Sequence, residues 1–432
     1  MHHKPMPTRL VPRSSLAGSR VCRYNPDGLA TQTSHSRIEA IDFLRGFAVL
    51  GILAINITGF WGPSLATFSP TIPRWEQGGE AWFGVAFVLF EGKMRALFSL
   101  LFGASMVLFA EAAERSGANP DAAQLRRLMW LALFGYLHFA LLWWGDILFT
   151  YALCGMAALA LRRLAPFQLM AIALPFYVLA QTMSAFVALP GIFAEQAVLA
   201  GNAASTDIAE QAGMMVRIGQ SVSDDIAILQ AGFFEAIRLK LTQSALHPLN
   251  VVLSTFTETV PLMLIGMAAL RSGFFFNWSR RSLAWLAVGG IASGALPTIL
   301  ALQWLAAHDW PPRAMFAAIE HGMAVPHLLM AAGYAAALVL VFPWAKDSGL
   351  GRALAAAGRC AFTNYLGTSM LMCAIFCGWG LGLGPEVPRA WLPGFVLLGW
   401  AAMLAWPQWW LARFAQGPME GFWRKLALPT RG

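Results

Sequence analysis

Long apolar runs recur along almost the whole chain, and short polar stretches separate them. A helical run of about twenty apolar residues matches the thickness of the hydrocarbon core of a bilayer. The pattern predicts about ten membrane-spanning helices, near residues 40–60, 82–113, 128–144, 147–161, 167–189, 252–271, 283–305, 314–342, 357–380 and 391–413. The predicted fold class is therefore all-α, a polytopic membrane protein.

The composition supports this class. Of the 432 residues, 58% are hydrophobic and 12% are charged, and the mean hydropathy is +0.58. A soluble domain carries about 25% charged residues, roughly twice this share. The composition therefore excludes an ordinary soluble protein.

The polar stretches divide the chain into five predicted segments. These are a tail at 1–37, a membrane half with five spans at 38–189, a loop region at 190–250, a second half with five spans at 251–415 and a tail at 416–432. The first tail lacks the apolar core of a secretory signal, and we interpret it as disordered. The loop region predicts amphipathic helices on the outer face. They either cover an active site or form a domain without chemistry.

The basic residues fix the expected orientation. The net charge is +8, and 21 of the 30 lysines and arginines fall on one side of the predicted spans, against six on the other. By the positive-inside rule both termini are cytoplasmic. This asymmetry accounts for the basic balance, so we expect no nucleic-acid partner. Arg45, Lys93 and Arg95 remain, inside or at the margin of spans.

The segment "FEGKMR" places Glu91, Lys93 and Arg95 within five positions of a predicted span. Ionisable groups inside a membrane are costly and often functional. Glu91 and Arg95 are four apart, a spacing that favours an ion pair on a helix, whereas Lys93 points away and needs another partner. Glu258, in a later span, can complete a polar cavity or counter Lys93. Mutual neutralisation and a functional cavity both remain open.

On the outer side, the predicted depths bring Asn56, His138 and Asp146 to similar levels. Asp146 follows His138 by eight residues, across the short turn "WWGDIL". Such a hairpin can bring the carboxylate to the imidazole and orient it as a general base. A core histidine bonded to a backbone carbonyl is the alternative. His321 and His327 are further candidates, although their six-residue spacing puts them on opposed helix faces.

On the inner side, "GRCAFTNYL" supplies Arg359, Asn364 and Tyr365 at the start of the ninth predicted span. Arg352 and Arg359 can meet the phosphates of a cytoplasmic cofactor, or they can anchor the protein at the inner surface. The five cysteines lack the spacing of a metal site. We predict no metal.

Several blocks carry a resemblance to a known family. They are "RIEAIDFLRGFAVLGILAINI", "FEGKMRALFSLLFG", "LHFALLWWGDILFTYAL", "GRCAFTNYL" and "GPMEGFWRKL". Together they resemble the YeiB family of bacterial inner-membrane proteins. That family is similar to a wider group of transmembrane acyltransferases, which includes the lysosomal heparan-glucosaminide N-acetyltransferase. The resemblance implies transfer of an acyl group from cytosolic acyl-CoA to an acceptor across the membrane.

The first block also resembles the opening helix of membrane O-acyltransferases that decorate bacterial surface sugars. Those enzymes carry a histidine eleven residues after the arginine, where this chain has Asn56. Asparagine cannot act as a general base, so His138 becomes the candidate base. The lysosomal relative also has an asparagine at the corresponding place.

The expected function is thus a membrane-embedded acyltransferase of the bacterial inner membrane, with acyl-CoA as donor and a hydroxyl or amine acceptor at the outer side. The predicted site residues are His138, Asp146 and Asn56 for catalysis, Glu91, Lys93, Arg95 and Glu258 for a cavity or oxyanion site, and Arg45, Arg359, Asn364 and Tyr365 for the cofactor. The expected partners are membrane lipids and a small-molecule or saccharide acceptor, and the sequence is compatible with a homodimer. The alternative is a secondary transporter or exporter with Glu91, Lys93 and Glu258 as a relay, although no inverted repeat supports it.

Overall fold

The chain folds into helices. The structure is a computed structural model that describes residues 26–73, 78–384 and 386–427, and this part of the chain contains no strand. The α-helices are α1 (Pro26–Trp61), α2 (Glu80–Leu89), α3 (Lys93–Arg115), α4 (Pro120–Leu141), α5 (Leu148–Ala160), α6 (Pro166–Leu199), α7 (Ser205–Gln230), α8 (Phe233–Gln243), α9 (His247–Arg271), α10 (Arg280–Ala307), α11 (Pro312–Ala317), α12 (Ala324–Ala345), α13 (Gly349–Arg359), α14 (Ala361–Phe376), α15 (Leu392–Leu411) and α16 (Pro418–Ala427). The predicted all-α class is confirmed.

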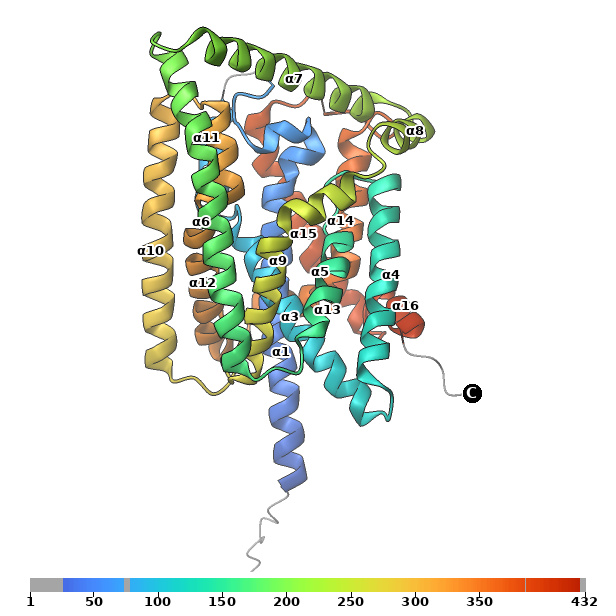
Figure 1. Cartoon of the computed structure of the whole chain (residues 1–432). Helices are drawn as coiled ribbons and strands as arrows, with labels where there is room; N and C mark the ends of the chain where they lie inside the picture. Colours follow the sequence, from blue (N-terminus) through green and yellow to red (C-terminus); the bar gives the residue numbers. More distant parts are fainter. Residues whose placement is uncertain (1–25, 74–77, 385, 428–432) are drawn as a thin grey trace, which may run out of the picture.

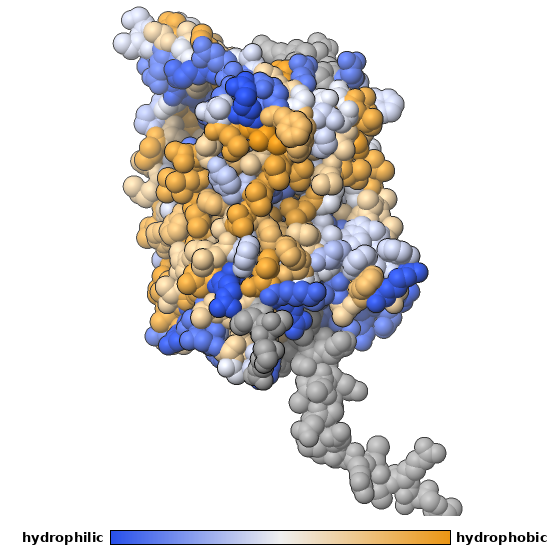
Figure 2. Space-filling view, turned by 90° about the vertical axis from the view of Figure 1, so that its right-hand side faces the viewer, coloured by the Kyte–Doolittle hydropathy of each residue, from blue (hydrophilic) through white to orange (hydrophobic). Residues whose placement is uncertain are grey.

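Seven helical segments of the described chain are long and apolar enough to cross a membrane. They are Glu39–Trp61, Glu80–Arg115, Pro166–Leu199, His247–Arg271, Arg280–Ala307, Ala324–Ala345 and Arg389–Leu411. The other three predicted spans fall on α4, α5 and α14. Figure 2 shows an apolar band around the middle of one face, with polar surface at both ends. This distribution is typical of a protein that lies in a bilayer.

The long helices lie side by side, and α7 crosses one end of them (Figure 1). We call this the α7 end, and we call the opposite end, where α1 begins and α16 packs on α4 and α14, the α16 end. Helix α1 runs between the other helices and packs against α3, α13, α14 and α15. Residues 1–25 of the predicted tail lie outside the described residues, and α1 already begins at Pro26.

Glycines allow the closest helix crossings. A Cβ on Gly46 would lie 1.9 Å from the carbonyl oxygen of Leu354, and a Cβ on Gly358 would lie 1.7 Å from that of Asp42. Helices α1 and α13 can therefore pack backbone against backbone, as small residues permit in membrane proteins. This contact fixes the start of α14, which carries part of the site.

The predicted span 82–113 is not one continuous helix. Helix α2 ends at Leu89, and α3 begins at Lys93 after a γ-turn in which the Lys93 N–H donates to the carbonyl of Glu91 at 2.8 Å. The central residue is Gly92, with φ 71° and ψ −38°. A γ-turn of this hand is strained for other residues, so glycine determines where the helix breaks.

Candidate active site

The hairpin between α4 and α5 brings His138 and Asp146 together. His138 Nδ1 lies 3.0 Å from Asp146 Oδ1, and the two side chains are 0% and 1% exposed. The second carboxylate oxygen accepts the backbone N–H of Phe149 at 2.8 Å, which caps the first turn of α5. The contact expected from the eight-residue spacing is therefore present, and the carboxylate is held at both oxygens.

The other imidazole nitrogen of this pair has spare hydrogen-bonding capacity. His138 Nε2 is buried and has no hydrogen-bond partner among the residues that the structure describes. When the Asp146 carboxylate accepts the Nδ1–H, Nε2 carries a lone pair. This is the arrangement that a general base needs.

Tyr365 covers one side of the imidazole. The two rings are 5.0 Å apart, and the Tyr365 hydroxyl accepts the Ile147 N–H and donates to the Gly145 carbonyl, at 3.3 and 3.4 Å. Asn56 is half-buried and borders, with Tyr365, a separate void of about 10 Å³. Asn56 is thus close to Tyr365, and its predicted catalytic role stays a prediction.

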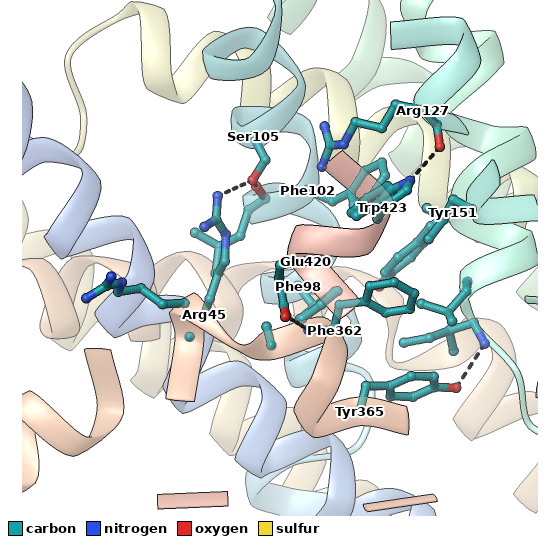
Figure 3. A pocket seen from close by; sticks show the side chains of 17 residues that line it. Arg45, Phe98, Phe102, Ser105, Arg127, Tyr151, Phe362, Tyr365, Glu420 and Trp423 are labelled. Carbon is teal, nitrogen blue, oxygen red and sulfur yellow. Dashed lines mark hydrogen bonds between the residues drawn. The ribbon is translucent and has the colours of Figure 1, made fainter. Parts of the chain in front are cut away.

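A cavity of about 180 Å³ adjoins Tyr365 and extends to α16, which contributes Glu420 and Trp423 to its lining (Figure 3). Arg45, Arg127, Arg359 and Tyr365 are among the residues that line this α16-end cavity. Arg45 donates to Asp42 and Ser105, and Arg359 donates to the Ala415 carbonyl at 2.8 Å. Three of the four residues predicted for cofactor binding therefore share one cavity.

Arg127 also lines the cavity. No role was predicted for it, because it is one of the 21 basic residues that the positive-inside rule assigns to the cytoplasmic side. Its guanidinium lies 4.3 Å from the Trp423 ring and 4.8 Å from the Phe109 ring. In the described part of the chain no carboxylate lies within ion-pair distance of it. A cation held between aromatic rings without an acid is suited to an anionic ligand.

Glu420 is the second cavity residue without a predicted role, although it lies in the block "GPMEGFWRKL". Its carboxylate accepts the N–H groups of Phe362 and Thr363 at 2.7 and 3.0 Å, and the Thr363 hydroxyl at 2.6 Å. Burial nevertheless raises the pKa of Glu420. The N-terminus of α14, a position that favours anions, is therefore filled by a side chain of α16.

Asn364 does not line the cavity. Its side-chain N–H groups donate to the carbonyls of Ala357 and Met403 at 3.1 and 3.3 Å, and its oxygen accepts the Trp406 ring N–H at 2.6 Å. These bonds tie α14 to α13 and α15. Both N–H groups are used for packing and the side chain lies outside the cavity lining, so its placement does not support the predicted cofactor role.

A second cavity, of about 340 Å³, lies beyond the hairpin at the α7 end. Its lining includes Phe139, Leu142 and Trp143, whereas Ile147 and Tyr365 line the α16-end cavity. Residues next to His138 and Asp146 thus line both cavities, whereas His138 and Asp146 themselves line neither. We call the second one the α7-end cavity.

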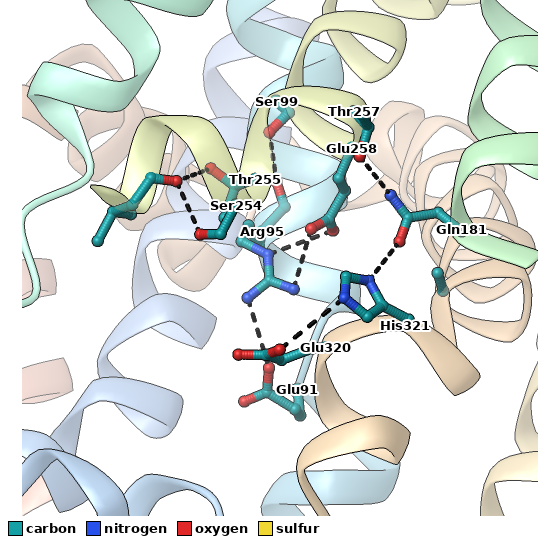
Figure 4. A network of polar contacts seen from close by, with 12 residues as sticks. Glu91, Arg95, Ser99, Gln181, Ser254, Thr255, Thr257, Glu258, Glu320 and His321 are labelled. Carbon is teal, nitrogen blue, oxygen red and sulfur yellow. Dashed lines mark hydrogen bonds and ion pairs between the residues drawn. The ribbon is translucent and has the colours of Figure 1, made fainter. Parts of the chain in front are cut away.

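The charges of "FEGKMR" form a different centre (Figure 4). Arg95 lies 3.7 Å from Glu91 and 3.2 Å from Glu258, which confirms the expected ion pair between positions 91 and 95. Glu258 therefore neutralises Arg95 and not Lys93. The Lys93 ammonium donates to the carbonyl of Phe87 at 2.7 Å, at the C-terminal end of α2.

None of these four charged residues lines either cavity. Lys93 turns toward α2 because the helix break exposes a carbonyl there, and Arg95 turns toward α9 because Glu258 lies on it. The oxyanion role predicted for Lys93 and Arg95 is therefore not supported by their placement. The link to the α16-end cavity runs through Ser99, whose hydroxyl donates to the Tyr151 hydroxyl at 3.0 Å.

The two other candidate histidines also lie near this network. His321 Nδ1 is 3.0 Å from the Gln181 side-chain oxygen, and its Nε2 is 3.8 Å from Glu320. His327 is buried and packs against Gly92, where a Cβ would approach its Nδ1 to 1.8 Å. Neither residue lines one of the two cavities beside His138.

Comparison with known proteins gives relatives without an assigned activity. Residues 269–430 match the family described as "Protein of unknown function (DUF418)". The chain is 28% identical to the uncharacterized protein YxaH of Bacillus subtilis (strain 168) over 404 residues, which cover 90% of this chain and 94% of that protein. It is 29% identical to the uncharacterized protein YeiB of Escherichia coli (strain K12) over 401 residues, which cover 91% and 96%. An uncharacterized 39.9 kDa protein of Bacillus acidopullulyticus is 34% identical over 128 residues, 30% of this chain and 35% of that protein. No solved structure matches the chain.

Proposed function

The chain belongs to the YeiB family, and from the arrangement of its own site we propose that it is a membrane-embedded acyltransferase. The observation that carries the proposal is the buried His138–Asp146 pair, whose Nε2 has no partner among the residues that the structure describes. The pair lines neither cavity itself, but its neighbour Phe139 lines the α7-end cavity and Tyr365, against the imidazole, lines the α16-end cavity. An enzyme that joins a donor from one side to an acceptor from the other needs this arrangement.

The proposed donor is an acyl-CoA in the α16-end cavity. Arg45, Arg127 and Arg359 supply cationic groups for its phosphates, and guanidinium groups bind phosphate well. The thioester then reaches toward Tyr365 and the His138 turn. Acetyl is among the acyl groups that suit a cavity of about 180 Å³.

The proposed reaction needs one base. The acceptor oxygen or nitrogen attacks the thioester carbonyl carbon, and a C–O or C–N bond forms as the C–S bond breaks. His138 Nε2 takes the acceptor proton and returns it to the departing sulfur, so that CoA leaves as the thiol. Asp146 keeps the imidazole in the required tautomer. Asn56 remains the candidate for polarising the carbonyl.

The proposed topology places the α16 end in the cytoplasm of a bacterium and the α7 end outside its inner membrane. This follows from the positive-inside rule, because most basic residues of the chain then lie in cytoplasmic segments. In this arrangement α4, α5 and α14 complete ten spans, both termini are cytoplasmic, and cytosolic acyl-CoA has direct access to the three arginines.

Acyl-CoA binding and turnover by the purified protein test the proposal. Wild-type protein is expected to bind acetyl-CoA or a longer acyl-CoA and to release CoA thiol. His138→Gln should keep binding and lose about 10²- to 10⁴-fold in turnover, the usual contribution of a general base. His308→Gln, at the exposed end of α10, is the matched control. Absence of both binding and thiol release across several chain lengths would remove the proposal.

A transporter is the second candidate, and the broken helix favours it. Many transporters bind their substrate or coupling ion where discontinuous helices expose backbone groups, and α2–α3 is such a break next to Glu91, Arg95 and Glu258. The two functions predict different growth defects for two substitutions, Arg95→Gln and His138→Gln. In a strain that depends on this protein, transport predicts that Arg95→Gln abolishes growth and that His138→Gln is tolerated, whereas acyl transfer predicts a severe His138→Gln defect.

A further inference from the structure

A further cavity, of about 460 Å³, is lined by α3, α6, α9, α10, α12 and the connection between α9 and α10. We call it the lateral cavity, and it lies toward the α16 end of these helices (Figure 1). Only Ser272 and Trp278 among the lining side chains carry a hydrogen-bond donor, and the Ser272 hydroxyl already donates to the carbonyl of Ala269 at 3.1 Å. A polar ligand would leave its own hydrogen bonds unmade here, so the cavity suits a hydrocarbon chain.

The lateral cavity reaches from the outer surface of the helix bundle into its core. Its lining includes Phe167, Met170 and Trp278, which are 72%, 37% and 42% exposed. It also includes Leu97 and Leu101 of α3, which are 0% and 1% exposed. Helix α6 packs mainly against α9, and α10 mainly against α12. The cavity therefore opens between α6 and α10, and the apolar length of both helices places the hydrocarbon of a bilayer in front of it.

Two arginines flank the α16-end rim of this cavity. Arg271, the last residue of α9, directly precedes the lining residue Ser272, and its guanidinium donates to the carbonyl of Leu164 at 3.0 Å. Arg280 is the first residue of α10, and its guanidinium lies 4.8 Å from the Trp344 ring of α12. The two cations thus stand at the facing ends of α9 and α10, and the connection between these helices lines the same end of the cavity.

The protein does not neutralise these two cations with ion pairs of its own. In residues 26–73, 78–384 and 386–427, no carboxylate lies within 4 Å of either guanidinium. The acids whose charges act on Arg271 are Glu111 and Glu114. They lie 4.0 and 3.8 Å from Arg115 and Arg162, and so pair with other cations. An anionic group from outside the chain is therefore the natural partner of the rim, and guanidinium groups suit phosphate best.

We propose that the lateral cavity is a binding site for an anionic phospholipid, with one acyl chain in the cavity and the head group against Arg271 and Arg280. The exposed rings of Trp278 and Trp344 mark the head-group level, where tryptophan is enriched. A hydrocarbon chain gains little by moving from lipid into an apolar pocket, because lipid tails are as apolar as leucine. Selectivity must therefore come from the cations, as it does in basic pockets between spans that bind anionic head groups.

The experiment titrates delipidated full-length protein with dioleoyl phosphatidylglycerol, dioleoyl phosphatidylcholine or oleate, and native mass spectrometry counts the bound lipid. A phosphatidylglycerol with a photoactivatable acyl chain locates the site by cross-linking. The test variants are Arg271→Gln, Arg280→Gln and Ala269→Phe, which fills the cavity. Arg352→Gln is the control for charge, because Arg352 is exposed at the same end and also donates to a backbone carbonyl. Ala292→Phe, exposed on α10, is the control for size.

Wild-type protein is expected to bind phosphatidylglycerol at least about fivefold more tightly than the two other lipids. Each arginine variant should lower this affinity by about fivefold, the effect of one interfacial charge, and Ala269→Phe should lose the cross-links, with both controls like wild type.

Three results would overturn the inference: equal affinity of wild type for phosphatidylglycerol and phosphatidylcholine or oleate, unchanged affinity in both arginine variants, or cross-links outside 97–101, 166–170, 265–286 and 332–335. If Ala269→Phe fails to fold, the arginine variants still decide. None of these outcomes depends on acyl-CoA, so the lipid site and the proposed reaction are tested separately.

Discussion

Gly92→Ala is the substitution whose cost the structure defines best. The residue is the centre of the γ-turn that separates α2 from α3, with φ 71°. A residue with a side chain held in such a region costs about 1–3 kcal/mol. A Cβ would in addition lie 1.8 Å from Nδ1 of the buried His327. Forcing extra volume into a packed site adds about 1–3 kcal/mol, so the expected loss of unfolding free energy is about 2–6 kcal/mol.

The control for this variant is Gly289→Ala in α10. No atom lies within 4 Å of a Cβ at Gly289, and the residue is inside a regular helix. Alanine is expected to be neutral there or to stabilise by about 0.5–1 kcal/mol. The two variants therefore make the same chemical change with opposite expected signs.

The assay is thermal or denaturant unfolding of the purified protein, followed by tryptophan fluorescence. Gly92→Ala should unfold at a clearly lower temperature than wild type, and Gly289→Ala should not. Adding His327→Ala to Gly92→Ala should restore part of the loss, because the overlap disappears and only the backbone strain remains. Equal stability of the two single variants would refute the account of the helix break.

Three further predictions concern the candidate site. Asp146→Asn is expected to keep acyl-CoA affinity and to lower turnover by about 10²- to 10⁴-fold, measured as CoA thiol release, because an amide can place the proton on the wrong imidazole nitrogen. Arg127→Met is expected to weaken acyl-CoA binding by about ten- to a hundredfold in calorimetry, from the loss of one charge-assisted contact, while the exposed Arg126→Met stays like wild type. Glu420 has a raised pKa, so the folded protein keeps this proton after the unfolded chain has released it. The contribution of Glu420 to the unfolding free energy is full below the usual glutamate pKa and is lost as the pH rises through the raised pKa. The unfolding free energy of wild type should therefore fall over this pH range, and that of Glu420→Gln should not show this fall.

Local spacing explains what could be predicted from the sequence. His138 and Asp146 are eight residues apart across a tight turn, so chain geometry alone limits how far apart their side chains can lie. The ion pair of Glu91 and Arg95 likewise joins residues close in sequence, although Glu91 precedes α3 and the two residues do not share a helix as the spacing predicted. Apolar runs of membrane length likewise predicted most helices, because hydrophobic length is a property of one segment.

Contacts between distant segments explain what was missed. Glu420 bonds to the start of α14, 57 and 58 residues before it in the chain, and no sequence pattern states that distance. Asn364 looks the same in the sequence whether it faces a cavity or a neighbouring helix. The rotation of α14 against α13 and α15 decides this, and that rotation depends on packing.

The two polar centres of the membrane part differ in one physical respect. Arg95 has a carboxylate on either side, and the Lys93 ammonium lies at the C-terminal end of α2, where the helix dipole and the Phe87 ring favour a cation. Each of these charges is thus compensated by the protein itself, which is what burial in a low-dielectric region requires. A buried imidazole nitrogen without a partner among the described residues occurs at both centres, Nε2 of His138 at the hairpin and Nε2 of His327 beside Gly92. His138 in addition has a carboxylate 3.0 Å from its Nδ1, and its neighbours Phe139 and Tyr365 each line a cavity, which is why we place the chemistry at the α4–α5 hairpin and not at the charged segment.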